Sequence, residues 1–325
     1  MAPSSPTPFL LGVNYPWLDY AGDFGGSPRG HFGVVSTEKF ERVKNDFEQM
    51  RECGVRVVRW FLFGDGRGGF LAKDGIPQKT DDLLLKDLDA ALRLAQASEI
   101  QLCFSLIDFL WLQDRGTPET KDSNEHILQY AAGREAFLQN VLVPIFSEFR
   151  GHPSLFAWEV ANEPEWAIHE FHRAPAAKMP LADFRAFAAE VVDAIHEFGH
   201  SSATLGSARL LWMRAWSELK LDFYQAHYYP STELETGQTL SQQLAPLAAL
   251  DRPLWLGELP AHDTNTANYS LEGALTQCRQ ASLSGAAVWR WTTPTPTDSD
   301  VAIGKANPEV LRAWLTGTPE PGINA

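Results

Sequence analysis

The sequence has little cysteine, few basic residues relative to acidic ones, and no long apolar stretch. Its three cysteines, Cys53, Cys103 and Cys278, are odd in number and far apart, so we expect free buried thiols rather than a disulfide framework or a metal site. With 27 basic and 41 acidic residues the net charge is −14, and no clustered lysine and arginine indicates a nucleic-acid partner. No apolar run reaches the length of a membrane-spanning helix, so no membrane partner is expected.

The terminal segments and the length of the chain limit which domain organisation is expected. Residues 1–8 contain neither a basic segment nor a long apolar one, so they do not resemble a secretory signal. The sequence is therefore compatible with a cytoplasmic protein and with a secreted protein whose signal has been removed. No linker, low-complexity segment or appended module interrupts the 325 residues. We expect a flexible segment over 1–8, one barrel domain over 9–317 and a tail over 318–325.

Apolar runs of strand length alternate with segments whose apolar residues recur at helical spacing. The expected strands are 9–15, 55–63, 100–107, 155–161, 203–206, 223–228, 253–257 and 285–291. The expected helices are 38–54, 81–98, 134–149, 181–198, 238–249, 271–284 and 308–315. Strands that are apolar throughout and alternate with helices are typical of a parallel sheet covered on both faces. Eight such units, without a Gly-rich phosphate-binding motif, predict the α/β class and a single (β/α)8 TIM barrel, with an open doubly wound sheet as the alternative.

The functional side chains of such a barrel lie at the carboxyl ends of the strands and in the loops that follow. Two of these ends carry a glutamate directly after an apolar run, namely Glu163 and Glu258. The other polar and aromatic residues at strand ends are Asn14, Trp17, Arg59, Asp108, Asn162, His227, Tyr229, Trp289 and Trp291. Sugar hydroxyls need directional hydrogen-bonding partners, and sugar C–H faces stack on aromatic rings. Paired carboxylates are also what cleavage of a glycosidic bond requires, so the sequence favours a carbohydrate-active enzyme.

Several of these residues form short motifs on successive strands: Arg59, Asn162-Glu163-Pro164, His227-x-Tyr229, Gly257-Glu258 and Trp291. This set resembles the strand-end motifs of the clan A retaining glycoside hydrolases, most of all family 5, the cellulase-like enzymes, or a close relative. The resemblance implies hydrolysis of a β-linked oligo- or polysaccharide by double displacement, without a cofactor or a metal. Glucan, mannan and other β-linked substrates all stay open, as do internal or terminal attack, the oligomeric state and protein partners.

The resemblance also implies roles for single residues. Glu163 would be the general acid/base, and Glu258 the nucleophile. Asn162 would bind the sugar 2-hydroxyl. Arg59 and Tyr229 would keep Glu258 ionised and directed at the anomeric carbon.

For the remaining candidate site residues, the expected roles are less specific. His227 would lie near Glu163 and help to set its protonation. Of the two tryptophans at the last strand, we expect one to form the floor of the −1 sugar site and favour Trp291, with Trp289 as the alternative. Trp17 and Asp108 are candidates for substrate contact because of their positions, although Trp17 could equally anchor a loop. Asn14 is a further candidate at the end of the first strand.

Three other functions remain open at this point. A transglycosylase would use the same carboxylates and pass the glycosyl group to a second sugar. A catalytically inactive barrel would bind glycans without turnover, and the presence of both carboxylates disfavours it. A metal-dependent barrel hydrolase would need a ligand set, and the pair His169 and His172, at i and i+3, has no evident further ligands.

Overall fold

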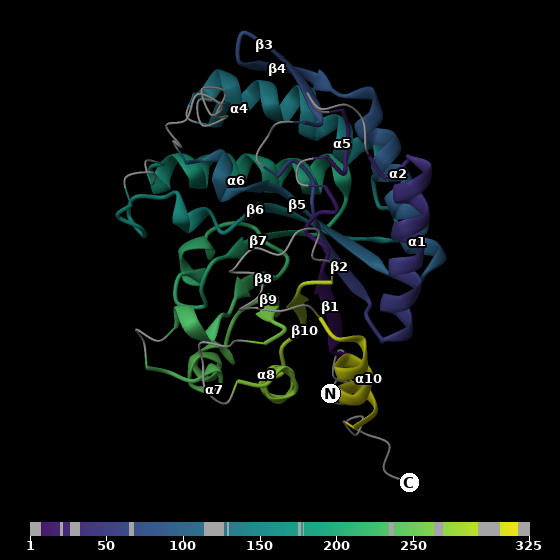
Figure 1. Cartoon of the computed structure of the whole chain (residues 1–325). Coiled ribbons are helices and arrows are strands. Elements are labelled where there is room, and N and C mark those ends of the chain that lie inside the picture. Colours follow the sequence, from purple (N-terminus) through teal and green to yellow (C-terminus); the bar gives the residue numbers. More distant parts are fainter. Residues whose placement is uncertain are drawn as a thin grey trace, which may run out of the picture.

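A closed barrel of parallel strands forms the centre of the protein (Figure 1). This computed structural model describes residues 8–19, 22–26, 33–64, 68–113, 127–128, 130–174, 177, 179–233, 237–262, 269–291 and 306–317. Within them the barrel strands are β1 (Leu10–Asn14), β2 (Val57–Phe61), β5 (Gln101–Asp108), β6 (Leu155–Asn162), β7 (Ala203–Ser207), β8 (Tyr224–His227), β9 (Leu254–Pro260) and β10 (Gly285–Trp289). Their order around the barrel is β1-β10-β9-β8-β7-β6-β5-β2. The prediction of a (β/α)8 barrel is confirmed.

Helices surround this barrel on the outside (Figure 1). They are α1 (Thr37–Glu52), α2 (Asp82–Ala97), α4 (Ala131–Phe137), α5 (Val143–Glu148), α6 (Leu181–Ala194), α7 (Leu240–Leu244), α8 (Leu271–Gln280) and α10 (Pro308–Gly317). A π-helical stretch, Leu138–Leu142, joins α4 to α5. The helix α10 lies beside the start of β1, where the rings of Phe9 and Trp314 have centroids 5.6 Å apart. The expected tail over 318–325 and nearly all of the segment 1–8 lie outside the described residues.

One connection differs from the sequence-based expectation. Residues before α2, expected as loop, form a hairpin of β3 (Phe70–Lys73) and β4 (Ile76–Thr80). Its turn is the pair Asp74-Gly75, both at positive φ, which is a strong hairpin signal. Between β7 and β8 there is only a short 3-10 helix, Met213–Trp216, within the described chain.

The interior of the barrel changes from apolar to polar along its axis. Near the amino ends of the strands, a separate buried cluster fills the barrel, with Val57, Ala157 and Trp255 among its members. Farther along β2 and β6, Arg59 and Glu159 are fully buried in the interior. Because the layer near the amino ends of the strands is apolar and packed, the charged residues lie toward the carboxyl ends, where catalytic residues of this fold lie.

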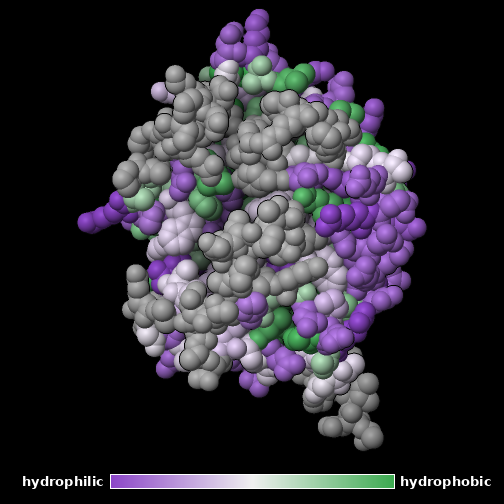
Figure 2. Space-filling view, in the orientation of Figure 1, coloured by the Kyte–Doolittle hydropathy of each residue, from purple (hydrophilic) through white to green (hydrophobic). Residues whose placement is uncertain are grey.

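The outer surface carries few apolar clusters in the view of Figure 2. Hydrophilic side chains gather over α1 and α2, and hydrophobic ones form small separate patches. No helix in the described parts of the chain is both long enough and apolar enough to cross a bilayer. Cys53, Cys103 and Cys278 are buried and unbonded to each other, as expected.

Candidate active site

The two glutamates singled out by the sequence lie close together at the mouth of the barrel. Glu163 directly follows β6 and Glu258 lies in β9. One carboxylate oxygen of each, and one ring nitrogen of His227, all lie within 4.8 Å of one another. His227 Nδ1 is 2.7 Å from Glu163 Oε1 and 3.5 Å from Glu258 Oε1. The structure thus brings the three residues into one cluster, in which the imidazole bridges the carboxylates.

Arg59 connects four side chains from three other strands. Its Nε and Nη2 donate to the two oxygens of Glu159 at 2.5 and 2.6 Å. Its Nη1 donates to Glu258 Oε1 at 2.7 Å and to Asn14 Oδ1 at 2.9 Å. Nη2 also donates to Asn162 Oδ1 at 2.7 Å. All five guanidinium hydrogens are therefore used. Burial lowers the pKa of this group, but the carboxylates of Glu159 and Glu258 together outweigh burial and the net shift is upward.

Glu159 is a site residue that sequence reasoning missed. Arg59 pairs with Glu258 through Nη1, as expected, but its bidentate partner is Glu159. Glu159 also accepts hydrogen bonds from Ser105 Oγ at 3.0 Å and Gln225 Nε2 at 2.6 Å. A carboxylate in the middle of an apolar strand was the available signal, because a buried charge without a partner is costly.

Glycines on two strands make room for this polar cluster. A Cβ atom at Gly206 would lie 2.6 Å from Glu159 Oε1, and one at Gly257 would lie 2.6 Å from Gln225 Nε2. Both distances are shorter than real side chains allow. Glycine at these positions therefore lets Glu159 and Gln225 occupy the barrel interior beneath the two glutamates at its mouth.

Two strong donors hold the carboxylate of Glu258. Arg59 reaches Oε1, and the Tyr229 hydroxyl donates to Oε2 at 2.6 Å. Burial raises the pKa of Glu258 above its usual range, while both donors favour the ionised form. Burial also raises the pKa of Tyr229 well above 10, so its hydroxyl keeps its proton and continues to donate.

Glu163 has a different environment. Its Oε2 accepts from the Trp166 indole N–H at 2.8 Å, a contact that the sequence did not indicate. Burial raises the pKa of the Glu163 carboxyl to about 7, against the opposing hydrogen bond from Trp166. Burial lowers the pKa of His227 to about 4, so the neighbouring imidazole is neutral near pH 7. A carboxyl that keeps its proton near neutral pH suits a general acid.

Asp108 contacts a neighbouring amide. Its Oδ2 accepts from Asn162 Nδ2 at 2.8 Å, and its Oδ1 accepts from the backbone N–H of Leu110 at 2.9 Å. Because Arg59 donates to Asn162 Oδ1 on the other side, the orientation of the Asn162 amide is determined. Burial raises the pKa of Asp108 to about 7. Its contacts are therefore those of a residue that orients Asn162.

The exposure of the two tryptophans at the last strand favours Trp289 over Trp291 as the ring that could contact a sugar. This is the reverse of our preference from the sequence. Trp291 is 3% exposed, and its indole N–H donates to Asp46 of α1 at 3.3 Å, which turns the ring toward the helix layer. Trp289 is half-buried and packs edge-on against Trp17 and Phe61, with centroids 6.2 and 6.4 Å away. Trp289 is thus the more accessible ring, and half-buried Trp17 lies beside it.

The same three side chains are where a cation could bind. Among the described residues, Glu163, His227 and Glu258 have donor atoms close enough together to hold one. Three carboxylate oxygens nevertheless already accept hydrogen bonds from Arg59, Tyr229 and Trp166. An ion would have to displace or share these donors, so the hydrogen-bonding pattern fits a metal-free pair of carboxyl groups better.

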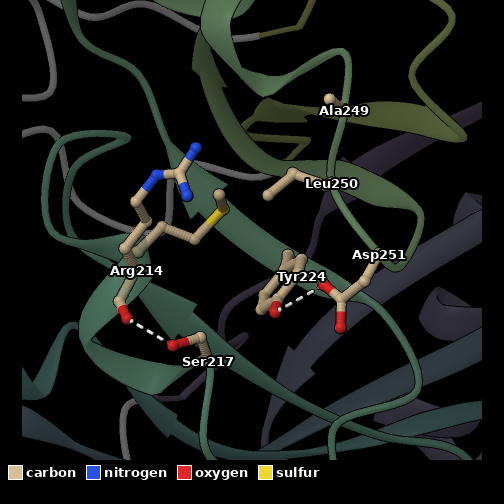
Figure 3. Close-up of a pocket in the computed structure, with 7 residues that line it drawn as sticks. Arg214, Ser217, Tyr224, Ala249, Leu250 and Asp251 are labelled. Carbon is tan, nitrogen blue, oxygen red and sulfur yellow. Dashed lines mark hydrogen bonds between the residues drawn. The ribbon is translucent and has the colours of Figure 1, made fainter.

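A pocket of about 300 Å³ lies between the connection that follows β7, the start of β8 and the residues that precede β9 (Figure 3). Arg214, Leu250 and Asp251 line it together with Tyr224, whose hydroxyl donates to Asp251 at 2.9 Å. Tyr224 begins β8, whereas His227 ends it. The pocket is therefore separate from the carboxylate cluster and contributes no residue to it.

Comparison with known proteins gives distant relatives of one kind. No family model matches the chain. A mannan endo-1,4-beta-mannosidase of Cryptopygus antarcticus is 26% identical over 163 residues, which is 49% of this chain and 39% of that protein. One of Mytilus edulis is 26% identical over 165 residues, 49% of this chain and 41% of that protein. The matches thus span well under half of the length of these curated relatives.

Solved structures agree on the fold over nearly the whole chain. The β-1,4-D-mannanase of Cryptopygus antarcticus has a TM-score of 0.73 at 20% identity, covering 96% of this chain and 91% of that one. A GH5_18 protein of Streptomyces cattleya in complex with Manβ1-4GlcNAc has a TM-score of 0.69 at 14% identity, covering 97% and 83%. Together, the sequence relatives and the solved structures support the resemblance of this chain to the clan A glycoside hydrolases of the cellulase-like family 5.

Proposed function

We propose that the protein is a retaining β-glycoside hydrolase that cleaves β-1,4-linked mannosides, with Glu163 as acid/base and Glu258 as nucleophile. The observation that carries this proposal is a pair of carboxyl groups with oxygens within 4.8 Å of each other and with different surroundings. Retaining enzymes hold their carboxyl groups about 5–5.5 Å apart, and inverting enzymes about 6.5–9.5 Å apart. The names of the relatives support mannoside as the substrate.

In the first step, Glu258 attacks the anomeric carbon and forms a glycosyl ester. Glu163 gives its proton to the glycosidic oxygen, so the leaving sugar departs as a neutral alcohol and Glu163 becomes a carboxylate. Arg59 and Tyr229 keep Glu258 ionised before attack. Glu258 thereby stabilises the positive charge that develops on the sugar ring. Glu163 neutralises the negative charge that develops on the leaving oxygen.

In the second step, water attacks the same carbon from the side of the departed sugar. Glu163 accepts a proton from this water, and the bond from the sugar to Glu258 breaks. The hemiacetal product keeps the β configuration, and both carboxyl groups return to their starting states. His227 Nδ1 lies 2.7 Å from Glu163 and supports both of its protonation states, because a neutral imidazole can donate or accept according to tautomer.

Asn162 would bind the sugar 2-hydroxyl. Its Oδ1 is taken by Arg59 and one hydrogen of Nδ2 by Asp108, which leaves the second Nδ2 hydrogen available. A hydrogen bond to the 2-hydroxyl strengthens in the transition state of glycoside hydrolysis. Asp108 would act through Asn162 rather than touch the sugar.

Replacement of Trp289 by leucine is expected to weaken substrate binding, because this ring is the accessible aromatic surface near Glu258. We expect kcat/KM to fall about tenfold, equivalent to about 1.4 kcal/mol of lost stacking. The matched change, Trp291→Leu, should lower thermal stability and leave KM close to that of the wild type. Steady-state kinetics and thermal melting of both variants measure this. A raised KM in Trp291→Leu alone would reinstate Trp291 as the platform.

The pH dependence of kcat/KM is expected to be bell-shaped. Glu163 must be protonated, so activity should fall as the pH rises through its pKa of about 7. Glu258 must be ionised, so activity should also fall as the pH drops through its own raised pKa. A profile measured from pH 4 to 9 tests both limbs. A rate that stays constant well above pH 8 would argue against Glu163 as the acid.

The function is tested by release of reducing sugar from β-1,4-mannan, β-1,4-glucan and Manβ1-4GlcNAc. We expect cleavage of mannan and a product that ¹H NMR shows first as the β anomer. Cleavage of the disaccharide alone would replace the polysaccharide with a small mannoside as substrate. Products that depend on an added sugar acceptor would indicate a transglycosylase, and loss of rate with EDTA a metal-dependent enzyme. Glycan binding without turnover would indicate an inactive barrel.

A further inference from the structure

Glu165, two residues beyond the proposed acid/base, is a fully buried carboxyl group outside the reaction described above. Its Oε1 lies 2.5 Å from Ser207 Oγ and accepts from the Trp216 indole N–H at 2.7 Å. Its Oε2 accepts from the backbone N–H of Ala208 at 3.0 Å. All three partners belong to the end of β7 or to the loop that follows it. The side chain therefore ties the turn after β6 to β7.

The hydrogen bonds of Ser207 explain how a carboxyl group can be accommodated there. Ser207 Oγ also lies 3.1 Å from the carbonyl oxygen of Arg209, yet its hydroxyl has a single hydrogen. A protonated Glu165 satisfies every group, since it donates to Ser207 and Ser207 donates to Arg209. Burial raises the pKa of Glu165 to about 7, in agreement with this arrangement.

The turn that Glu165 holds contains an unfavourable backbone conformation. Glu163 has φ 48° and ψ 45°, in the left-handed region, which is unfavourable for a non-glycine residue. The backbone N–H of Glu163 donates to the carbonyl of Gly206 in β7 at 2.7 Å. The side chain of Glu165 makes the next contacts on the same strand end. The left-handed residue is therefore anchored to β7 on both sides of Pro164.

The loop bonded to Glu165 also contacts Trp166, the indole donor to Glu163. Trp212 packs edge-on against Trp166, with centroids 5.1 Å apart and planes at 80°. Trp216 follows Trp212 by one turn in the same loop and donates to Glu165. The Trp166 ring thus packs against the same loop that Glu165 holds through Trp216.

We propose that Glu165 is a positioning residue for proton transfer. By fixing the 163–166 turn to the end of β7, it holds the carboxyl of Glu163 and the indole of Trp166 in the geometry that protonates the leaving group. The inference rests on the proposed role of Glu163 as acid/base. Under this proposal, a buried carboxyl group that touches no substrate contributes to protonation of the leaving group.

The test is the dependence of Glu165→Gln on the leaving group. In this variant the new amide N–H₂ faces either the Trp216 N–H or the Ala208 N–H, so one anchor is lost. We expect kcat/KM on mannopentaose to fall about 10–100-fold, because this leaving group needs the proton. On 2,4-dinitrophenyl β-mannobioside we expect a change of no more than about threefold, because dinitrophenolate leaves without it. Equal losses on both substrates, or no loss, would overturn the proposal.

Two further variants separate positioning from general loss of structure. Ser207→Ala removes one anchor only and should give a smaller effect with the same dependence on the leaving group. Asp87→Asn is a matched control, because Asp87 is also fully buried and accepts from backbone N–H groups of Gly25 and Val35, far from Glu163 in the chain. It should lower both rates equally or not at all.

A measurement without substrate distinguishes failure of this inference from failure of the proposed function. If the wild type cleaves neither probe, the function is wrong and the kinetics say nothing of Glu165. The ¹³C NMR titration of the Glu163 carboxyl still reports on its surroundings. We expect Glu165→Gln to move its midpoint by at least about 0.5 pH unit. An unchanged midpoint would overturn the positioning role.

Discussion

Glu258→Gln is expected to lower kcat on β-1,4-mannan by at least about 10⁴-fold, the scale on which loss of a catalytic nucleophile acts. An amide cannot form the glycosyl ester through which the proposed reaction passes. The change also alters the hydrogen bonds, because Arg59 and Tyr229 donate to the two separate oxygens of Glu258. A glutamine offers only one acceptor, so one donor would face an N–H₂ group. Reducing-sugar release under saturating mannan measures the effect.

The matched control for this change is Glu272→Gln, on the exposed face at the start of α8. It should retain full activity, and thermal melting should show that both variants are folded. Should Glu258→Gln keep more than about a tenth of the wild-type rate, the nucleophile must be another group. That outcome would leave the barrel assignment intact and overturn the proposed division of roles between the two carboxyl groups.

Glu163→Ala is expected to lower kcat on mannan by about 10²–10⁴-fold, the usual contribution of a positioned general acid. With 2,4-dinitrophenyl β-mannobioside, formation of the glycosyl ester needs no proton, so the ester should accumulate and give a burst of dinitrophenolate. Added azide should restore turnover, because this anion attacks the ester without help from a base. Stopped-flow absorbance measures the burst, and the steady-state rate measures the rescue.

The configuration of the azide product tests the roles of both glutamates. Glu163→Ala should yield the β-mannobiosyl azide, since azide attacks the ester formed on Glu258 and configuration is retained overall. Glu258→Ala should yield the α-azide, because azide then replaces the nucleophile in a single inverting displacement. The opposite pair of results would mean that the two carboxyl groups exchange roles.

Much of the site followed from local sequence patterns. Apolar runs alternating with helical repeats predict a parallel barrel, because such strands must be covered on both faces. Once the strands are placed, position alone brings Glu163, His227 and Glu258 to one rim, since parallel strands present their carboxyl ends on the same side. The structure joins these three residues in one cluster, as the sequence implied.

Partners across the barrel depend on register and strand order, which local patterns do not encode. Arg59 in the second strand meets Glu159 in the fourth only because β5 lies between β2 and β6 in a closed sheet, at one particular stagger. The sequence indicated Glu258 as the partner of Arg59, which the structure also shows, but it did not indicate Glu159. The same limit applies to Asp108, whose position was predicted while its contact with Asn162 was not.

By itself the sequence determined the barrel, the strand ends and the two glutamates, because periodicity and position along a strand are local properties. Only the tertiary structure decided which of Trp289 and Trp291 is accessible, and that Trp166 donates to Glu163. These outcomes depend on where the last strand ends, on a helix that offers Asp46, and on a left-handed residue that turns the chain. Each is set by contacts between segments far apart in the chain, where packing rather than local preference chooses the conformation.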